Sequence, residues 1–296
     1  MRRGQPSRTA EAAAAVRASH HHHASPRIFV DPFALDLTSS GWRFIVRHSA
    51  LDWLVTRVLL RSLRSISALV LVRSRYAEDK LEAAIKSGVG QYVIIGAGFD
   101  SFALRRRDLA HSLLVFELDH PATQQTKIRR VTQLGLAIPN NLQFVPIDFE
   151  KEDLSTALRQ SRYQSQRPAF FSWLGTTHYL SKAAIRSTLE SLVACSAPDS
   201  ELVFDYSLPR ASLPPEDART MRRLERFTSR RGEPLISHFD PEELSNELRL
   251  LGYSVVEDLS GAEQRDRYFR GRSDGLAPTQ AAHLVHLCVV RRLTSA

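Results

Sequence analysis

The sequence predicts an α/β fold, built on a mostly parallel sheet of seven strands with helices on both faces. Three observations lead to this fold class. Short apolar runs recur from residue 91 onward, helical stretches lie between most of them, and two further apolar runs lie near the end of the chain. Such alternation is typical of a doubly wound sheet, and continuous apolar runs are typical of strands buried on both faces.

The first 90 residues are expected to form a helical region, and residues 91–296 a second, sheet-forming region. Helices are predicted over residues 8–18, 53–72 and 75–87. Alanines favour the first helix, apolar residues at helical spacing favour the second, and Gly88 follows the third as a typical helix-ending glycine. The histidines at 20–23 are expected in an exposed turn, because prolines follow them.

Five parallel strands and a closing antiparallel pair are expected in the second region. The parallel strands are predicted near residues 91–95, 113–118, 142–147, 169–174 and 201–206, the pair near 253–258 and 283–290, and helices over 122–134 and 182–194. No helix is evident between the last two strands, so a hairpin is expected there.

Composition excludes several classes of protein. Hydrophobic residues make up 43% and charged residues 24% of the chain, as in ordinary globular proteins. No apolar run approaches the roughly 20 residues of a membrane span, and no secretory signal is evident near the N-terminus, so a cytoplasmic protein without a membrane partner is expected. The two cysteines cannot build a disulfide framework or a cysteine-rich zinc site, and no metal is expected.

The net charge of +8 is spread over short groups of arginines. Neither an RNA-binding aromatic motif nor a zinc finger accompanies them, so no nucleic-acid partner is expected. Solvated helix faces explain most of this charge, and a pocket for an anionic small substrate is the alternative. The oligomeric state is not indicated by the sequence.

Glycines follow the first expected strand, where a ligand can approach the backbone closely. Gly96 and Gly98 stand in the sequence GAGFDS, so the turn and the next helix start can face a bound molecule. A dinucleotide-binding loop would carry a third glycine at the place of Ser101. A tight turn without a ligand is the alternative.

An acidic residue lies at the end of each of the next two expected strands. Asp119 follows the glycines by about 20 residues, a position from which a carboxylate binds ribose hydroxyls. Glu117 is expected to lean to the same side, because side chains alternate along a strand. Asp148 with Phe149 suits an adenine. The carboxylate can accept a hydrogen bond from the exocyclic amine, and the phenyl ring can pack against the base. Either aspartate has an alternative role as a helix N-cap.

Five phrases occur in order along most of the chain, from about Ala12 to Val290: VIIGAGFDSFALR, VFELDHPATQQTK, VPIDFEKEDL, FFSWLGTTHYLSKAAI and YFRGRSDGL. Together they resemble the leucine carboxyl methyltransferase superfamily, in particular its bacterial branch, which includes carboxyl O-methyltransferases of polyketide pathways. The resemblance implies a class I methyltransferase fold with a Rossmann-like sheet, S-adenosyl-L-methionine as cofactor, and an N-terminal helical cap over the site.

The resemblance also implies how the cofactor is held. Gly96 and Gly98 would lie against its methionine part, Asp119 would bind its ribose, and Asp148 with Phe149 its adenine.

An arginine that binds the cofactor carboxylate in the family matches Arg73, with Arg75 as the fallback. Arg17 is a possible match for a second basic residue from the cap. Relatives often carry Trp-Glu-Gly on the fourth strand, whereas this chain has Leu174 in place of the glutamate. A carboxylate at the cofactor edge is therefore missing there.

Acceptor-side candidates come from two loops. His178 and Tyr179 follow the fourth strand, and Tyr268 and Arg272 lie in the sequence YFRGRSDGL. An arginine fork binds a carboxylate in a bidentate manner, so Arg272, or alternatively Arg270, is a candidate for an acidic acceptor. Packing or a solvated turn is the alternative role for each.

The residue chemistry favours a carboxylate of a small acidic metabolite as methyl acceptor. A carboxylic acid with a pKa of about 4 is ionised at neutral pH and needs no base, whereas a hydroxyl would need one, with His178 or His120 as first candidates. No pair of base and carboxylate is evident in the sequence. The alternatives are a nicotinamide-dependent oxidoreductase, disfavoured by Ser101 and by Asp148 with Phe149, and a catalytically inactive cofactor-binding protein.

Overall fold

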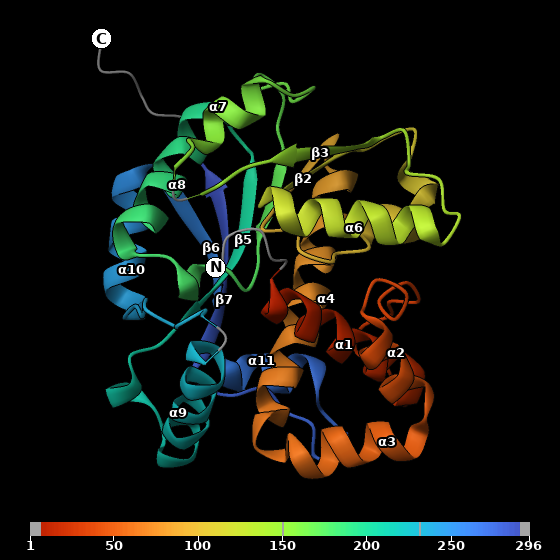
Figure 1. Ribbon diagram of the computed structural model, residues 1–296. Coiled ribbons are helices and arrows are strands. Elements are labelled where there is room, and N and C mark those ends of the chain that lie inside the picture. Colours follow the sequence, from red (N-terminus) through yellow and green to blue (C-terminus); the bar gives the residue numbers. More distant parts are fainter. Residues whose placement is uncertain (1–6, 150, 231, 291–296) are drawn as a thin grey trace.

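The computed structural model describes residues 7–149, 151–230 and 232–290. Within this part, seven strands form one sheet (Figure 1). They are β1 (Gln91–Ile95), β2 (Leu114–Asp119), β3 (Leu142–Pro146), β4 (Phe170–Trp173), β5 (Glu201–Ser207), β6 (Tyr253–Leu259) and β7 (Ala282–Val289). The expected regions 1–90 and 91–296 extend beyond the described residues at both ends.

The strand order is β3-β2-β1-β4-β5-β7-β6. The first five strands pair in parallel, and β7 runs antiparallel to both β5 and β6. The predicted α/β fold with a mostly parallel seven-stranded sheet is confirmed. The chain leaves β1 to β6 at one common edge of the sheet, the carboxyl edge, where ligands bind in open α/β sheets.

Helices precede the sheet and then alternate with its strands. Those before it are α1 (Arg8–His23), α2 (Ser40–Arg47), α3 (Ser49–Trp53), the π-helical segment η1 (Leu54–Leu59), the 3-10 turn η2 (Arg61–Leu63) and α4 (Arg64–Lys86). Those that follow are α5 (Phe102–Arg105), η3 (Arg107–Leu109), α6 (Pro121–Gln133), α7 (Leu154–Arg159), η4 (Thr177–Tyr179), α8 (Lys182–Cys195), η5 (Arg210–Ser212), α9 (Pro215–Ser229), α10 (Pro241–Leu251) and α11 (Gly261–Tyr268). None of the described helices is both long and apolar enough to cross a membrane.

The sheet separates two hydrophobic clusters. Helices α7, α8 and α10 pack on one face, and α4 and α5 pack on the other. Alternate residues of β1 point to opposite faces of the sheet. Val93 packs in the cluster under α7, α8 and α10, and Ile94 packs in the cluster under α4 and α5. By the same alternation β5 directs Val203 toward α4, and Asp205, two residues on, lies on that side at the carboxyl edge.

Three local predictions are wrong. The histidines at 20–23 belong to the last turn of α1, where the His20 ring accepts a hydrogen bond from the Ile28 backbone N–H at 2.8 Å. The helices expected over 53–72 and 75–87 are divided differently, since the chain breaks in η1 and η2 and α4 then runs unbroken. Apolar residues at helical spacing, in a segment without glycine or proline, do not locate such a break.

A helix also lies between the last two strands, where a direct hairpin was expected. The polar sequence of α11 hides it from a search for apolar periodicity. Its N-terminus nevertheless carries a capping box, in which the Ser260 hydroxyl accepts from the Glu263 N–H and the Glu263 carboxylate accepts from the Ser260 N–H.

Candidate functional site

The turn after β1 is closely covered by two other segments. Gly96 and Gly98 have φ angles of 69° and 53°, which favour glycine. A Cβ atom on Gly96 would lie 2.4 Å from the Thr176 side chain, and one on Gly98 would lie 3.0 Å from Ala10 of α1. Both positions therefore require glycine, and the start of α1 lies directly over the turn.

Asp119 lies against this turn. Its carboxylate accepts hydrogen bonds from the Gly98 N–H at 2.5 Å and the His120 N–H at 2.6 Å. Burial raises the pKa of Asp119, against the effect of these two donors. The N-cap of α6 is His120, whose Nδ1 accepts from the Ala122 N–H at 3.2 Å. The N-cap alternative for Asp119 is therefore wrong.

Whereas Asp119 contacts the glycine turn, Glu117 is paired with another side chain of the protein. It is fully buried and forms an ion pair with Lys127 of α6. Burial raises the pKa of Glu117 to about 7, which the Lys127 ammonium partly offsets.

Asp148 and Phe149 follow β3 at the same carboxyl edge. Asp148 contacts the Lys151 ammonium, and the Phe149 ring is half-buried against the cluster under α7 and α8. The N-cap of α7 is Asp153, which accepts from the Thr156 N–H at 2.8 Å. The cap alternative for Asp148 is therefore also wrong.

Arg73 and His178 meet at a residue that the sequence analysis did not single out, Asp205. Its side chain is fully buried, and its Oδ2 lies 3.2 Å from Arg73 Nη1 and 3.3 Å from His178 Nε2. Its Oδ1 accepts from the Gly175 N–H at 2.6 Å. Although burial opposes ionisation, Arg73 and His178 hold the pKa of Asp205 well below its usual range. A base and a carboxylate are thus paired, contrary to the sequence-based expectation.

Both ring nitrogens of His178 have partners within the protein. Asp205 only accepts, so Nε2 carries the proton, and Nδ1 then accepts from the Ser207 hydroxyl at 3.1 Å. Neighbouring Tyr179 is half-buried, and burial raises its pKa to about 12. Neither side chain offers a free basic atom near neutral pH in this arrangement.

The other arginines and Leu174 are placed differently. Arg75 is exposed and pairs with Asp79 of its own helix. Arg17 lies beside the β1 turn, where it donates to the Phe99 carbonyl at 2.7 Å and pairs with Asp31 at 2.9 Å. Leu174 packs against the cluster under α4.

The candidates from the end of α11 and the loop after it have other partners. The Tyr268 hydroxyl donates to Asp79 at 3.1 Å. Arg272 holds Asp274 through two hydrogen bonds, at 3.0 and 2.8 Å, and Arg270 is exposed. The structure brings neither Tyr268 nor Arg272 into contact with the group around Asp205.

Two buried polar atoms beside the glycine turn and the start of α1 lack a hydrogen-bond partner within the described part of the chain. Among the described residues, Thr176 Oγ1 and Glu233 Oε2 are buried without a hydrogen-bond partner. Thr176 lies over Gly96, and Glu233 is bonded through its other oxygen to Ser7, which precedes α1. A ligand with polar atoms would satisfy both, so the residues fit a nucleoside cofactor with an amino-acid part.

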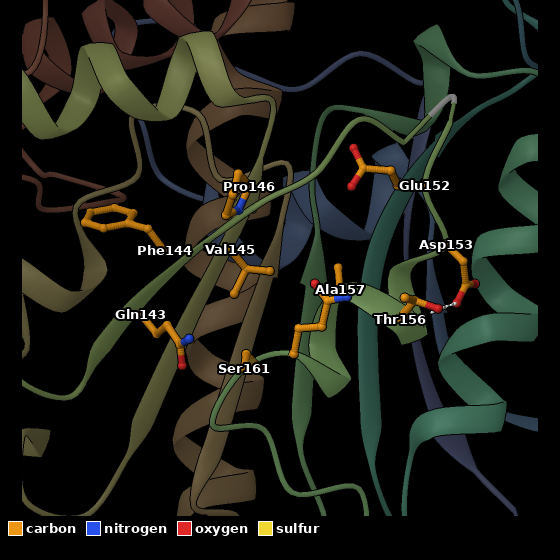
Figure 2. Close-up of a pocket in the computed structure, with 10 residues that line it drawn as sticks. Gln143, Phe144, Val145, Pro146, Glu152, Asp153, Thr156, Ala157 and Ser161 are labelled. Carbon is orange, nitrogen blue, oxygen red and sulfur yellow. Dashed lines mark hydrogen bonds between the residues drawn. The ribbon is translucent and has the colours of Figure 1, made fainter.

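Two surface cavities lie elsewhere. One, of about 290 Å³, lies between β3 and α7, and Figure 2 shows its lining residues, with Phe144 at one side and Glu152 and Asp153 at the other. The other, of about 570 Å³, lies between α8, α10 and the end of β7. No predicted site residue lines either cavity, so neither is the candidate active site.

The sheet order, the glycine turn after β1 and the acid at the end of β2 define an α/β class I methyltransferase fold. The sequence of residues 10–193 matches the family model described as "Leucine carboxyl methyltransferase". The chain belongs to this family.

A relative from Bacillus subtilis (strain 168), "Putative S-adenosyl-L-methionine-dependent methyltransferase YktD", is 30% identical over 97% of this chain and 99% of its own length. A relative from Mycolicibacterium paratuberculosis, "Putative S-adenosyl-L-methionine-dependent methyltransferase", is 29% identical over 92% of this chain and 91% of its own length. The chain is accordingly an S-adenosyl-L-methionine-dependent methyltransferase, and the oxidoreductase and inactive-protein alternatives are not favoured.

A solved structure shows the same fold. A "putative methyltransferase" from Thermobifida fusca superimposes with a TM-score of 0.63 at 15% identity, covering 98% of this chain and 97% of its own. This likeness supports the fold assignment alone.

Proposed function

We propose that this methyltransferase transfers the methyl group to a carboxylate oxygen of a small acidic metabolite. The observation that carries the proposal is the environment of His178, whose two ring nitrogens are occupied by Asp205 and Ser207. His120 is engaged as well, because its Nδ1 accepts from the helix backbone and the neutral ring then carries its proton on Nε2. A carboxylate acceptor needs neither ring, since it is already ionised at neutral pH.

The cofactor supplies a methyl group on a positively charged sulfur when it is bound. In the proposed site Gly96 and Gly98 let the backbone approach it, and Asp119 accepts from the ribose hydroxyls. Asp148 and Phe149 hold the adenine, and Arg73 donates to the carboxylate.

Asp205 acts through Arg73. It fixes the guanidinium by an ion pair at 3.2 Å and is itself held by the Gly175 N–H. Preorganisation of this kind matters, because orientation alone can supply roughly 7–11 kcal/mol of a reaction barrier.

The helical region over residues 1–90 would serve as the cap of this site. Ala10 of α1 lies over Gly98, and Arg17 donates to the carbonyl of Phe99 in the same turn. A cap in this place would exclude water and hold cofactor and acceptor in line.

The test uses cofactor with an isotopically labelled methyl group and a panel of matched pairs, each a carboxylic acid and its hydroxyl analogue. Methyl esters release volatile methanol in mild base, whereas methyl ethers do not. Base-labile product from the acids supports the proposal. Label that appears only in base-stable product would contradict it and leave the methyltransferase assignment standing.

A further inference from the structure

Glu233 holds a buried carboxylate oxygen without a partner at the candidate site. The residue lies in the loop between α9 and α10. Its Oε1 accepts from the Ser7 hydroxyl at 3.1 Å, and its Oε2 is buried without any hydrogen-bond partner among the described residues. Leaving a buried carboxylate oxygen unpaired costs free energy, so we expect a bound ligand to supply a hydrogen-bond donor to it.

Tyr179 shows what surrounds this oxygen. Burial raises the pKa of Tyr179, Arg73 lowers it and Glu233 raises it. Three residues after Glu233, the Ile236 N–H donates to the carbonyl of His178, the neighbour of Tyr179, at 2.7 Å. Positive and negative side chains thus lie around one phenol, at the carboxyl edge of the sheet. Such a pair matches an α-amino acid, which carries an ammonium and a carboxylate on one carbon atom.

The other acids at this edge are already engaged. Asp205 uses Oδ1 for the Gly175 N–H and Oδ2 for Arg73 and His178. Asp119 accepts two backbone N–H groups beside the glycine turn and is assigned to the ribose in the proposed site. Within the described chain, Glu233 is therefore the carboxylate at this edge with a buried oxygen that lacks a partner.

We propose that Glu233 binds the α-ammonium group of S-adenosyl-L-methionine, opposite Arg73 at the carboxylate. The proposal extends the cofactor site proposed above and rests on Arg73 holding the other end of the amino-acid part. Charge-assisted hydrogen bonds of this kind are about twice as strong as neutral ones.

The same residue links the cofactor to the cap. Ser7 bonds to Glu233 through its hydroxyl and to the Thr123 hydroxyl of α6 through its backbone N–H, at 3.2 Å. Ser7 is also the N-cap of α1, accepting from the Ala10 N–H. Cofactor bound at Glu233 would thereby fix the start of α1 over the glycine turn.

Calorimetric titration of Glu233→Gln with two ligands tests the proposal. The ligands are S-adenosyl-L-methionine and its analogue with hydrogen in place of the α-amino group. We expect the Kd of the intact cofactor to rise about tenfold, equivalent to about 1.4 kcal/mol, and that of the analogue to stay within twofold. Glu243→Gln, an exposed glutamate of α10, is the matched control and should change neither Kd.

A thermal melt of the free protein separates ligand binding from a structural role. Removing a charge that has an unpaired oxygen should leave the melting temperature of Glu233→Gln unchanged or raise it. A lower melting temperature with an equal loss of affinity for both ligands would overturn the proposal. Unchanged affinity for both would overturn it as well.

Arg73→Lys, titrated with the decarboxylated analogue, tests the other end of the site. If Arg73→Lys weakens the binding of the intact and the decarboxylated cofactor equally, Arg73 does not bind the cofactor carboxylate. That outcome would not decide the role of Glu233, because Glu233→Gln is tested with the intact cofactor and the analogue that lacks the α-amino group.

Discussion

Asp119 and Asp205 occupy equivalent places in the topology, near the carboxyl ends of the parallel strands β2 and β5, yet their surroundings are opposite. Asp119 is bonded to backbone N–H groups, and burial raises its pKa. Asp205 lies between Arg73 and His178, which lower its pKa. The Asp119 carboxylate is bonded to neutral backbone donors, and the Asp205 carboxylate to a guanidinium and an imidazole ring.

This difference indicates two kinds of role. A carboxylate held by neutral backbone donors keeps its charge available to a ligand, as Asp119 does in the proposed ribose contact. A carboxylate bonded to a guanidinium and an imidazole ring is occupied by the protein itself, and its effect reaches the ligand through the side chains that it orients. Asp205 is therefore a positioning residue, and the substitutions below separate the two roles.

The largest effect is expected for stability when Asp205 is removed. Asp205→Ala leaves the half-buried Arg73 without its fully buried partner, which should lower the free energy of unfolding by about 3–5 kcal/mol. Urea unfolding measures this. Asp266→Ala, at an exposed position of α11, should stay within about 0.5 kcal/mol of the parent protein. A loss at Asp205 no larger than that of the control would contradict the ion-pair account.

The same pair predicts a pH dependence. The pKa of Asp205 is lower in the folded protein than its ordinary value of about 3.9, so the stabilisation is complete above that value. It declines as the pH falls through the lowered folded pKa. The stability difference between the parent protein and Asp205→Asn should therefore shrink below about pH 4. A difference that grows on acidification would have the wrong sign for this pair.

The next effect is expected for cofactor affinity at Asp119. Loss of a hydrogen-bonded carboxylate on a ribose diol should cost about 1.5–3 kcal/mol, so Asp119→Ala should raise the Kd of S-adenosyl-L-methionine roughly ten- to a hundredfold. Calorimetry on a variant with native circular dichroism measures it. If the Kd stays at the parent value in a folded variant, the ribose assignment is wrong.

A smaller effect separates Arg73 from its neighbour Arg75. Arg73→Ala should weaken the binding of the intact cofactor about tenfold more than the binding of the decarboxylated analogue, because the lost contact is to the carboxylate. Arg75→Ala is the control, since Arg75 is exposed and paired with Asp79. Equal responses of the two arginine variants would show that Arg73 has no special relation to the cofactor.

The centre of the sheet could be predicted from the sequence because strands such as β1, β4 and β5 are buried on both faces. Runs such as QYVII and ELVFDYS need no partner segment to be recognised, and β1 and β5 begin where these runs begin. The breaks in η1 and η2 and the polar helix α11 could not be predicted in this way. Their positions depend on packing against other segments rather than on local periodicity.

Part of the candidate site could be predicted as well. Gly96, Gly98 and Asp119 are recognised by their spacing, and the structure brings Gly98 and Asp119 into contact. The pairing of His178 with Asp205 could not be predicted, because α8 separates the two residues along the chain. An acid within an otherwise apolar buried strand was the available signal for Asp205. Glu233 lies in a polar loop, where no local pattern distinguishes it.

The pH dependence of methyl transfer tests the central claim most directly. With a carboxylate acceptor, the logarithm of the rate should stay flat between about pH 6 and 8, because the nucleophile is ionised across that range. His178→Gln should leave the shape of the profile unchanged. A rate that climbs through this range, with the rising limb abolished in His178→Gln, would contradict a carboxylate acceptor and identify a base-dependent hydroxyl acceptor.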